Sequence, residues 1–436
     1  MIVEQFDVEF RRDGSIFDQG QVTSLLSGLQ EASDLMVLCH GWNANKEDAE
    51  GFCDRFLANL TQVQEDAEGA AAPRLAVLRV FWPSKKFTDA DLIPGGGVAS
   101  ADSENDEGLL HALSVLQQDP DRLGGTDDDS VRARSLGQAV ALIDQLETSE
   151  SARREYVLRI RSVLNPDEAH HDDGSVEFFV RDPEDLFETF SVPVPVELAV
   201  GEGGAAFVSD GGGAAMGDLL SGIQAAARRI ANFGTYYEMK TRAGTVGRIG
   251  LTSVLLRVRE RYPELPVHLV GHSFGGRLVT AAASMIAPGG ARVTMSLLQA
   301  AYSHNGLGKK FDGLHDGAFR RLLDDALISG PVVITYTKND SAVGIAYPLA
   351  SRLSLDNTSG LGDRNDPYGG MGRNGAQHTP EVSGDETEIR GVGVPPAYSF
   401  RPGKVYNLNA DSFITSHEDV TNPPVANVVL AAMDSR

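Results

Sequence analysis

The chain has 436 residues, of which 42% are hydrophobic, so it can bury a sizeable core and is not an intrinsically disordered protein. Acidic residues number 61 and basic residues 38, which gives a formal net charge of -23 at pH 7. Such a charge repels phosphate backbones and anionic lipid surfaces. The composition therefore disfavours nucleic-acid binding and adhesion to membranes, and it predicts a well-solvated acidic surface.

The N-terminal residues carry acidic side chains where a signal peptide needs basic and then apolar ones. No later apolar run approaches the length of a membrane span. We therefore expect a cytoplasmic protein, and secretion without a cleaved signal stays open. The only cysteines, Cys39 and Cys53, form neither a disulfide framework nor a metal-binding pattern, and Cys39 lies in an apolar run that predicts a buried thiol.

Along most of the chain, short apolar runs rich in β-branched residues alternate with longer segments of helical periodicity. The expected strands cover residues 2–10, 34–43, 74–84, 266–273, 292–302, 330–340 and 403–411. The expected helices cover residues 21–32, 46–67, 243–262, 275–286 and 316–328, with a short one that begins near residue 416. This alternation is typical of an α/β protein with a mainly parallel sheet flanked by helices.

Two segments depart from this alternation. Residues 85–234 show no rhythm of parallel strands, and a segment of that length cannot be a structureless loop in a compact domain. We expect an inserted cap or lid subdomain there, with the core formed by residues 1–84 and 235–436. Residues 351–402, which begin with a stretch rich in Gly, Asn and Asp, predict a long loop excursion within the core.

The inserted segment has helical periodicity at residues 133–147 and 151–164. Its acidic clusters at residues 102–107 and 127–129 lack the ligand spacing of an EF-hand, so they predict a solvated acidic face and not a calcium site. Its glycine-rich stretches lack the pattern of a phosphate-binding loop.

One serine stands out in the stretch "LVGHSFGG", residues 269–276. Ser273 lies between Gly271 and Gly275 at the point where an expected strand gives way to an expected helix. In such a sharp turn, glycines two residues before and after the serine remove Cβ atoms that would clash. The context favours a nucleophile over an incidental turn serine, and a nucleophilic serine needs a base, an acid and N–H donors.

The stretch resembles the nucleophile elbow of the α/β-hydrolase superfamily, and "VLCHGWN" at residues 37–43 is similar to the oxyanion loop of that superfamily. The resemblance implies a nucleophile after the fifth strand, an acid after the seventh and a histidine after the eighth. Ser273, Asp340 and His417 match that order. It also implies that the backbone N–H groups of Trp42 and Phe274 form the oxyanion hole.

The resemblance covers residues 34–84 and 236–302 well, and residues 330–340 and 403–433 moderately. It covers neither the inserted segment nor the long excursion, so access to the site and its specificity stay open.

Other residues compete for these roles. His304, His315 and His378 are alternatives to His417 as the base, and Asp312 and Asp316 are alternatives to Asp340 as the acid.

Neighbouring residues are expected to support the site. We interpret His272 as structural, with its side chain directed away from the serine, and His40 as a residue that holds its loop by donating to the backbone. Tyr236 and Tyr237 lie either at the rim of the pocket or at the base of the cap. The Trp42 ring lies over the acyl side or packs in the core.

The three matched residues predict a serine hydrolase that cleaves a carboxylic ester through an acyl-enzyme. Apolar stretches at residues 139–146 and 176–180 of the insertion favour a lipase-like or long-chain esterase. Thioesterase and amidase activities use the same triad. The alternative classes are a non-catalytic binding module of this fold and a secreted effector whose acidic insertion binds a basic partner. We expect a small-molecule or lipid-like ester as the partner, with no cofactor, metal or nucleic acid.

Overall fold

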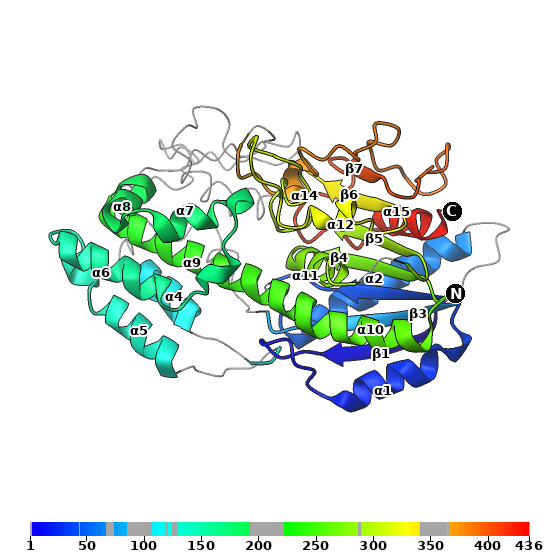
Figure 1. Cartoon of the computed structure of the whole chain (residues 1–436), viewed down its shortest axis with the longest axis horizontal. Helices are drawn as coiled ribbons and strands as arrows, with labels where there is room; N and C mark the ends of the chain where they lie inside the picture. Colours follow the sequence, from blue (N-terminus) through cyan, green and yellow to red (C-terminus); the bar gives the residue numbers. More distant parts are fainter. Residues whose placement is uncertain are drawn as a thin grey trace, which may run out of the picture.

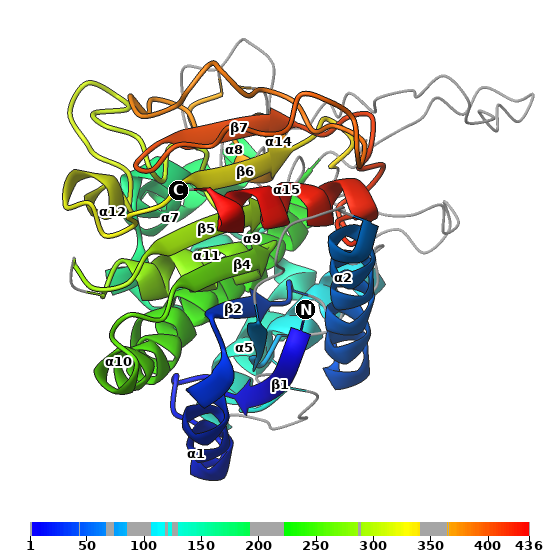
Figure 2. The same cartoon turned by 90° about the vertical axis from the view of Figure 1, so that its right-hand side faces the viewer.

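The computed structural model describes residues 2–42, 44–66, 74–84, 106–117, 121–123, 130–191, 222–286, 289–340, 364 and 366–435. These residues form an α/β fold around one seven-stranded parallel sheet, in the order β1-β3-β2-β4-β5-β6-β7 (Figures 1 and 2). The strands are β1 (Ile2–Glu9), β2 (Asp34–Cys39), β3 (Leu75–Phe81), β4 (Val267–His272), β5 (Val293–Leu298), β6 (Val332–Tyr336) and β7 (Val405–Asn409). The prediction of a parallel sheet flanked by helices is confirmed.

Both faces of the sheet are buried, which explains why its strands are nearly continuous apolar runs. In β2, Leu35, Val37 and Cys39 belong to the core on one face, and Met36 and Leu38 belong to the core on the other. None of the five side chains is exposed to solvent. Successive side chains of a strand point to opposite faces, so an unbroken apolar run fits a sheet covered on both sides.

Helices cover the two faces (Figure 2). The core on the first face includes residues of α1 (Gln19–Gly28), α10 (Thr252–Arg261) and α11 (Phe274–Ala283). The core on the second face includes residues of α2 (Lys46–Asp66) and α15 (Pro423–Asp434).

Two expected helices differ from the structure. The segment 316–328 contains only the short helix α12 (Arg321–Asp324), because the N–H groups of Gly317 and Phe319 donate to the carbonyls of Gly308 and Gly306. The C-terminal helix begins at Pro423 and not near residue 416. There the side chain of Asn422 accepts from the N–H of Val425, and proline suits a first helical turn.

The described part of the insertion is a helical cap with its own hydrophobic core (Figure 1). Its helices are α4 (Asp106–Gln117), α5 (Ser130–Val140), α6 (Glu150–Arg161), α7 (Ser175–Val180) and α8 (Pro183–Ser191). They pack with the first half of α9 (Ile223–Thr245). The acidic clusters at 102–107 and 127–129 lie almost entirely outside the described residues.

Helix α9 crosses the predicted boundary between residues 234 and 235 without a break. It continues through a π-helical turn, η5 (Val246–Leu251), into α10. The turn lies against the nucleophile helix, since a Cβ on Gly247 would come 2.3 Å from the carbonyl oxygen of Leu278. The cap is therefore joined to the core by one helix that belongs to both.

Short segments complete the description. The 3-10 turns are η1 (Leu29–Glu31), η2 (Ile143–Gln145), η3 (Pro166–Glu168) and η4 (His171–Asp173). Within the expected excursion at 351–402, residues 351–363 and 365 lie outside the described residues. The rest is irregular apart from α14 (Met371–Asn374), and it touches the edge strand β7 through bridges to Val405 and Asn409.

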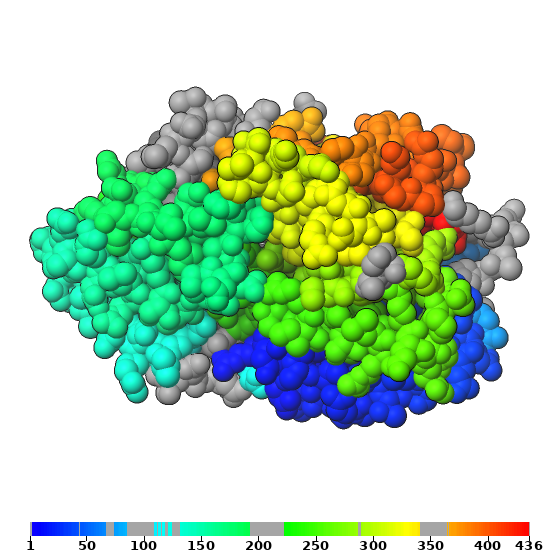
Figure 3. Space-filling model, viewed as in Figure 1, coloured from blue at the N-terminus to red at the C-terminus, as the bar shows by residue number. Residues whose placement is uncertain are grey.

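A second connection joins the cap to the core, through the segment around η4. The Asp172 carboxylate accepts from the N–H of Ala318 at 2.9 Å, and the Asp172 carbonyl accepts from the Ser303 hydroxyl at 2.5 Å. Asp173 and Lys240 form an ion pair of 2.5 Å with side chains only 5% and 1% exposed. Figure 3 shows the cap in contact with the segment after β5.

No helix in the described ranges is long and apolar enough to cross a membrane. Cys39 and Cys53 are buried free thiols, and burial raises the pKa of Cys53 to about 12. The expectation of a buried Cys39 is confirmed.

Asp173→Ala should destabilise the protein, because it leaves the Lys240 ammonium buried without its carboxylate. We expect a loss of about 3–5 kcal/mol in the free energy of unfolding, measured by urea denaturation. The double variant Asp173→Leu with Lys240→Met is the control, and it should recover most of the loss because neither charge of the pair is left buried without its partner. Equal losses in both variants would contradict this account.

Candidate active site

Ser273 occupies a strained turn between β4 and α11. Its backbone has φ 55° and ψ −126°, a region that residues with a side chain rarely adopt. A Cβ on Gly271 would lie 2.4 Å from the carbonyl oxygen of Gly275, and a Cβ on Gly275 would lie 2.4 Å from that of His40. Both neighbours are backbone atoms, so only glycine fits at these two positions.

The structure brings together the three residues predicted as a triad. The Ser273 hydroxyl lies 2.8 Å from Nε2 of His417, and Nδ1 of His417 lies 2.9 Å from Oδ2 of Asp340. The hydrogen-bond partners of His417 assign the tautomer of its neutral ring. Its Nδ1–H donates to the Asp340 carboxylate, and its Nε2 accepts from the Ser273 hydroxyl. Ser273 is 3% exposed and Asp340 is fully buried.

Each of the three follows a strand at the same end of the sheet. The described strands place Ser273 after the fourth, Asp340 after the sixth and His417 after the seventh, whereas the resemblance implied the fifth, seventh and eighth. The order is the same, and the described sheet has one strand fewer.

The charge environment of His417 favours its protonated form. Burial acts against protonation, but the attraction and hydrogen bond of Asp340, together with the charge of Glu418, outweigh it and raise the pKa of His417 to about 9. The imidazolium that forms when a base takes the serine proton would be stabilised in the same way.

The two segments that carry the predicted oxyanion donors meet at Ser273. Phe274 is the first residue of α11, so the helix offers no acceptor to its N–H. A Cβ on Gly41 would come 2.8 Å from the Cβ of Ser273, which shows how closely the loop before Trp42 approaches. The rings of Trp42 and Phe274 meet edge to face at 5.5 Å.

His40 fixes this loop as a neutral side chain. Its Nδ1–H donates to the Gly41 carbonyl at 2.8 Å, and its Nε2 accepts from the Trp82 N–H at 3.4 Å. The Trp82 indole N–H donates to the His40 carbonyl at 3.1 Å. Burial lowers the pKa of His40 to about 4, so the ring carries no charge near neutral pH. The expected donation to the backbone is present.

His272 holds the loop that carries the triad histidine. Its Nε2–H donates to the backbone carbonyl of His417 at 2.9 Å, and its ring stacks on Phe52 at 5.4 Å. Burial lowers the pKa of His272. The residue before Ser273 therefore positions His417 through the main chain of His417.

Sequence reasoning missed a second link between the acid and histidine loops. The Asp411 carboxylate accepts from the Thr337 hydroxyl at 2.8 Å and from the Lys338 N–H at 2.9 Å. The Asn339 amide donates to the carbonyls of Asp411 at 3.1 Å and Ile414 at 2.8 Å. Polar residues directly after both strands were the available signal, since the ends of parallel strands lie together.

The alternative histidines and aspartates have other hydrogen-bond partners. These pairs are His304 with Asn374, His315 with Asp312, His378 with Asn305, and Asp316 with the Lys310 N–H. Of the two tyrosines of α9, Tyr236 belongs to the core on the first face of the sheet, and Tyr237 does not. The Tyr236 ring lies 5.3 Å from that of Phe274, and Tyr237 belongs to the cap core.

Comparison with protein-family models, with curated proteins and with solved structures found no match for this chain.

Gly275→Ala should be strongly destabilising, because its Cβ would meet the backbone oxygens of His40 and Cys39 at 2.4 and 2.5 Å. Overpacking of this kind costs about 1–3 kcal/mol or more, measurable as a lower midpoint of urea unfolding. Gly137→Ala in α5 is the matched control. Nothing lies within 4 Å of its Cβ, so it should gain up to about 1 kcal/mol. A neutral Gly275→Ala would contradict the steric account of the elbow.

Proposed function

We propose that the protein is a serine hydrolase that cleaves a carboxylic ester through an acyl-enzyme on Ser273. The hydrogen-bonded chain from Ser273 through His417 to Asp340 carries the proposal. The strained φ of Ser273 supports it, because backbone strain persists where surrounding structure imposes it and clusters at functional sites. We also propose that the parallel sheet and helical insertion constitute an α/β-hydrolase fold with a cap.

The mechanism follows from the positions of the groups. His417 Nε2 takes the hydroxyl proton while the Ser273 oxygen attacks the carbonyl carbon, and Asp340 holds the ring and stabilises its positive charge. The N–H groups of Trp42 and Phe274 would donate to the oxyanion. Collapse of the tetrahedral intermediate expels the alcohol, which receives the proton from His417. Water activated by His417 then releases the acid and restores Ser273.

The substrate class is set by the surroundings of Ser273. The apolar stretches expected to hold an acyl chain mostly serve the cap itself: Ala139, Ile143, Leu146 and Phe178 are buried in the cap core. They give no support to a long-chain specificity. The ring of Phe274, the residue after Ser273, lies against the rings of Trp42 and Tyr236, and these rings support an ester with an apolar group at this position.

A fluorophosphonate probe should label Ser273, because the probe captures an activated serine whatever its natural substrate. Intact mass and peptide mapping should show one adduct, absent in Ser273→Ala. The same variant should lose hydrolysis of p-nitrophenyl esters by a factor of about 10⁴ or more. Ser284→Ala, at the other end of α11, is the control and should behave as wild type. Persistent hydrolysis in Ser273→Ala would overturn the proposal.

The rate should rise with pH, because His417 acts as a base only when it is unprotonated. Its pKa of about 9 predicts that the acid limb of log kcat/KM lies well above the ordinary histidine value of 6.5. Asp340→Asn removes the charge that raises this pKa, so the limb should move to lower pH while the maximal rate falls. The measurement is the pH dependence of kcat/KM, over a range from about pH 5 to about pH 10. A limb that stays in place in Asp340→Asn would contradict this assignment.

A further inference from the structure

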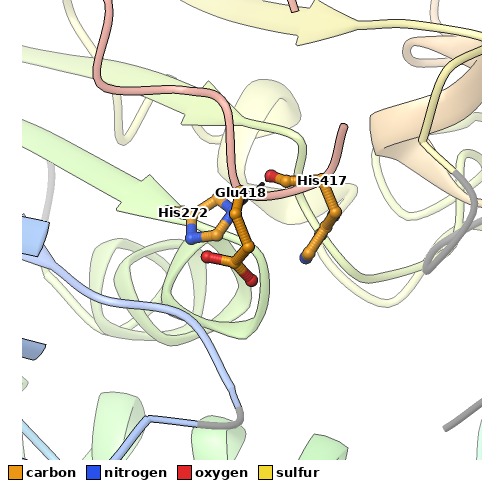
Figure 4. Close-up of side chains that lie close together, drawn as sticks. All are labelled: His272, His417 and Glu418. Carbon is orange, nitrogen blue, oxygen red and sulfur yellow. Dashed lines mark hydrogen bonds between the residues drawn. The ribbon is translucent and has the colours of Figure 1, made fainter. Parts of the chain in front are cut away.

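A group of metal-binding side chains adjoins the triad histidine. Glu418 follows His417, and its carboxylate lies beside the rings of His417 and His272 (Figure 4). One ligand atom from each of the three lies within 4.8 Å of the other two. His272 is buried, whereas Glu418 is exposed, so an ion could reach the group from the Glu418 side.

The hydrogen bonds of the two histidines leave each neutral ring with one nitrogen lone pair. His272 donates from Nε2–H to the His417 carbonyl, so its Nδ1 carries no hydrogen. His417 donates from Nδ1–H to Asp340, so its Nε2 carries none. A histidine held by a carboxylate on its far nitrogen is the outer-shell arrangement that metal sites use to orient a ligand.

We propose that His272, His417 and Glu418 bind a divalent transition-metal ion of the zinc type, and that the bound ion inhibits the enzyme by occupying His417. Two imidazoles and one carboxylate are a ligand set of zinc sites, with a fourth position left for water. Calcium and magnesium are disfavoured because they require oxygen ligands.

The three ligand atoms lie within 4.8 Å of one another and must move closer together to bind one ion. Bonds of about 2.0–2.1 Å in a tetrahedral site place ligand atoms roughly 3.3 Å apart. The Glu418 side chain is exposed, so it can move toward the two histidines. Coordination exchanges the hydrogen bond between Ser273 and His417 for a metal–nitrogen bond, with no change in oxidation state. Where the His417 ring is protonated, the Nε2 proton is released to solvent as the ion binds.

Binding and inhibition depend differently on the proposed function. Metal binding needs only the three side chains. Inhibition rests on the proposal that His417 is the base, so the experiment measures the two separately.

The experiment titrates the full chain with Co²⁺ and Zn²⁺. Visible absorption reports tetrahedral cobalt, and calorimetry gives the stoichiometry and affinity for zinc. We expect one ion per chain in wild type, and also in Ser273→Ala, which is inactive but keeps all three ligands. Glu418→Gln should weaken zinc binding by about 10-fold or more, as loss of a metal-site residue does. Because Glu418 is exposed, we expect Glu418→Gln to fold as the wild type does, and circular dichroism checks that the weaker zinc binding does not come from a folding defect.

The control is Asp312→Asn, which disrupts the hydrogen bond between Asp312 and His315, a histidine–carboxylate pair away from the triad. Its affinity for zinc should equal that of wild type. Absence of the tetrahedral cobalt spectrum in wild type, or equal zinc affinities in wild type and Glu418→Gln, would overturn the proposal of a site.

In the inhibition arm, zinc should suppress ester hydrolysis with a midpoint that matches the calorimetric affinity. That midpoint should rise about 10-fold in Glu418→Gln, with each variant compared to its own metal-free rate. Stoichiometric binding in a wild type without hydrolase activity would refute the proposed function and leave the metal site standing. Binding without inhibition of an active enzyme would refute the inhibitory role.

Discussion

The contact between the turn at Ser273 and the loop after β2 is the constraint on which the candidate site depends. β2 and β4 pair in parallel, with Cys39 opposite Gly271, so both chains leave the sheet at the same level. Gly275 then passes the carbonyls of Cys39 and His40 at distances that exclude a Cβ. The strained turn at Ser273 and the position of the first N–H of α11 follow from this approach. A methyl group at Gly275 would separate the serine from the predicted oxyanion donors.

Two histidines near that contact show how surroundings decide the chemistry of one residue type. His40 is buried against Trp82 and has no carboxylate partner among the residues that the structure describes, so the loss of solvation prevails and lowers its pKa to about 4. His417 is also largely buried, but Asp340 reverses the balance and raises its pKa to about 9. The first ring is suited to hold a backbone loop, and the second is suited to accept a proton and carry its charge.

The sequence was sufficient to predict the strands and to name Ser273, Asp340 and His417 as residues that come together, because both leave local signals. These signals are apolar runs, a glycine-flanked serine, and polar residues after strands. Where tertiary contacts prevail, it was not sufficient. Gly317 and Phe319 donate to a neighbouring loop and shorten α12, and α9 passes through a boundary drawn from composition. The apolar stretch 139–146 was assigned to a substrate, but it packs into the cap. Periodicity reports that a side chain is buried and does not report its partner.

The attachment of the cap argues against its movement as one rigid lid. Helix α9 enters the core without a break, and its π-helical turn packs against α11 where Gly247 meets the Leu278 carbonyl. Near the end of α9, the Lys240 side chain pairs with Asp173 of the cap, and the Lys240 carbonyl accepts from Arg277 of α11 at 2.9 Å. A hinge at this point would break a buried ion pair and disturb the helix that begins at the nucleophile. The segment around η4 is therefore held to the core by a buried ion pair and by hydrogen bonds to Ser303 and Ala318.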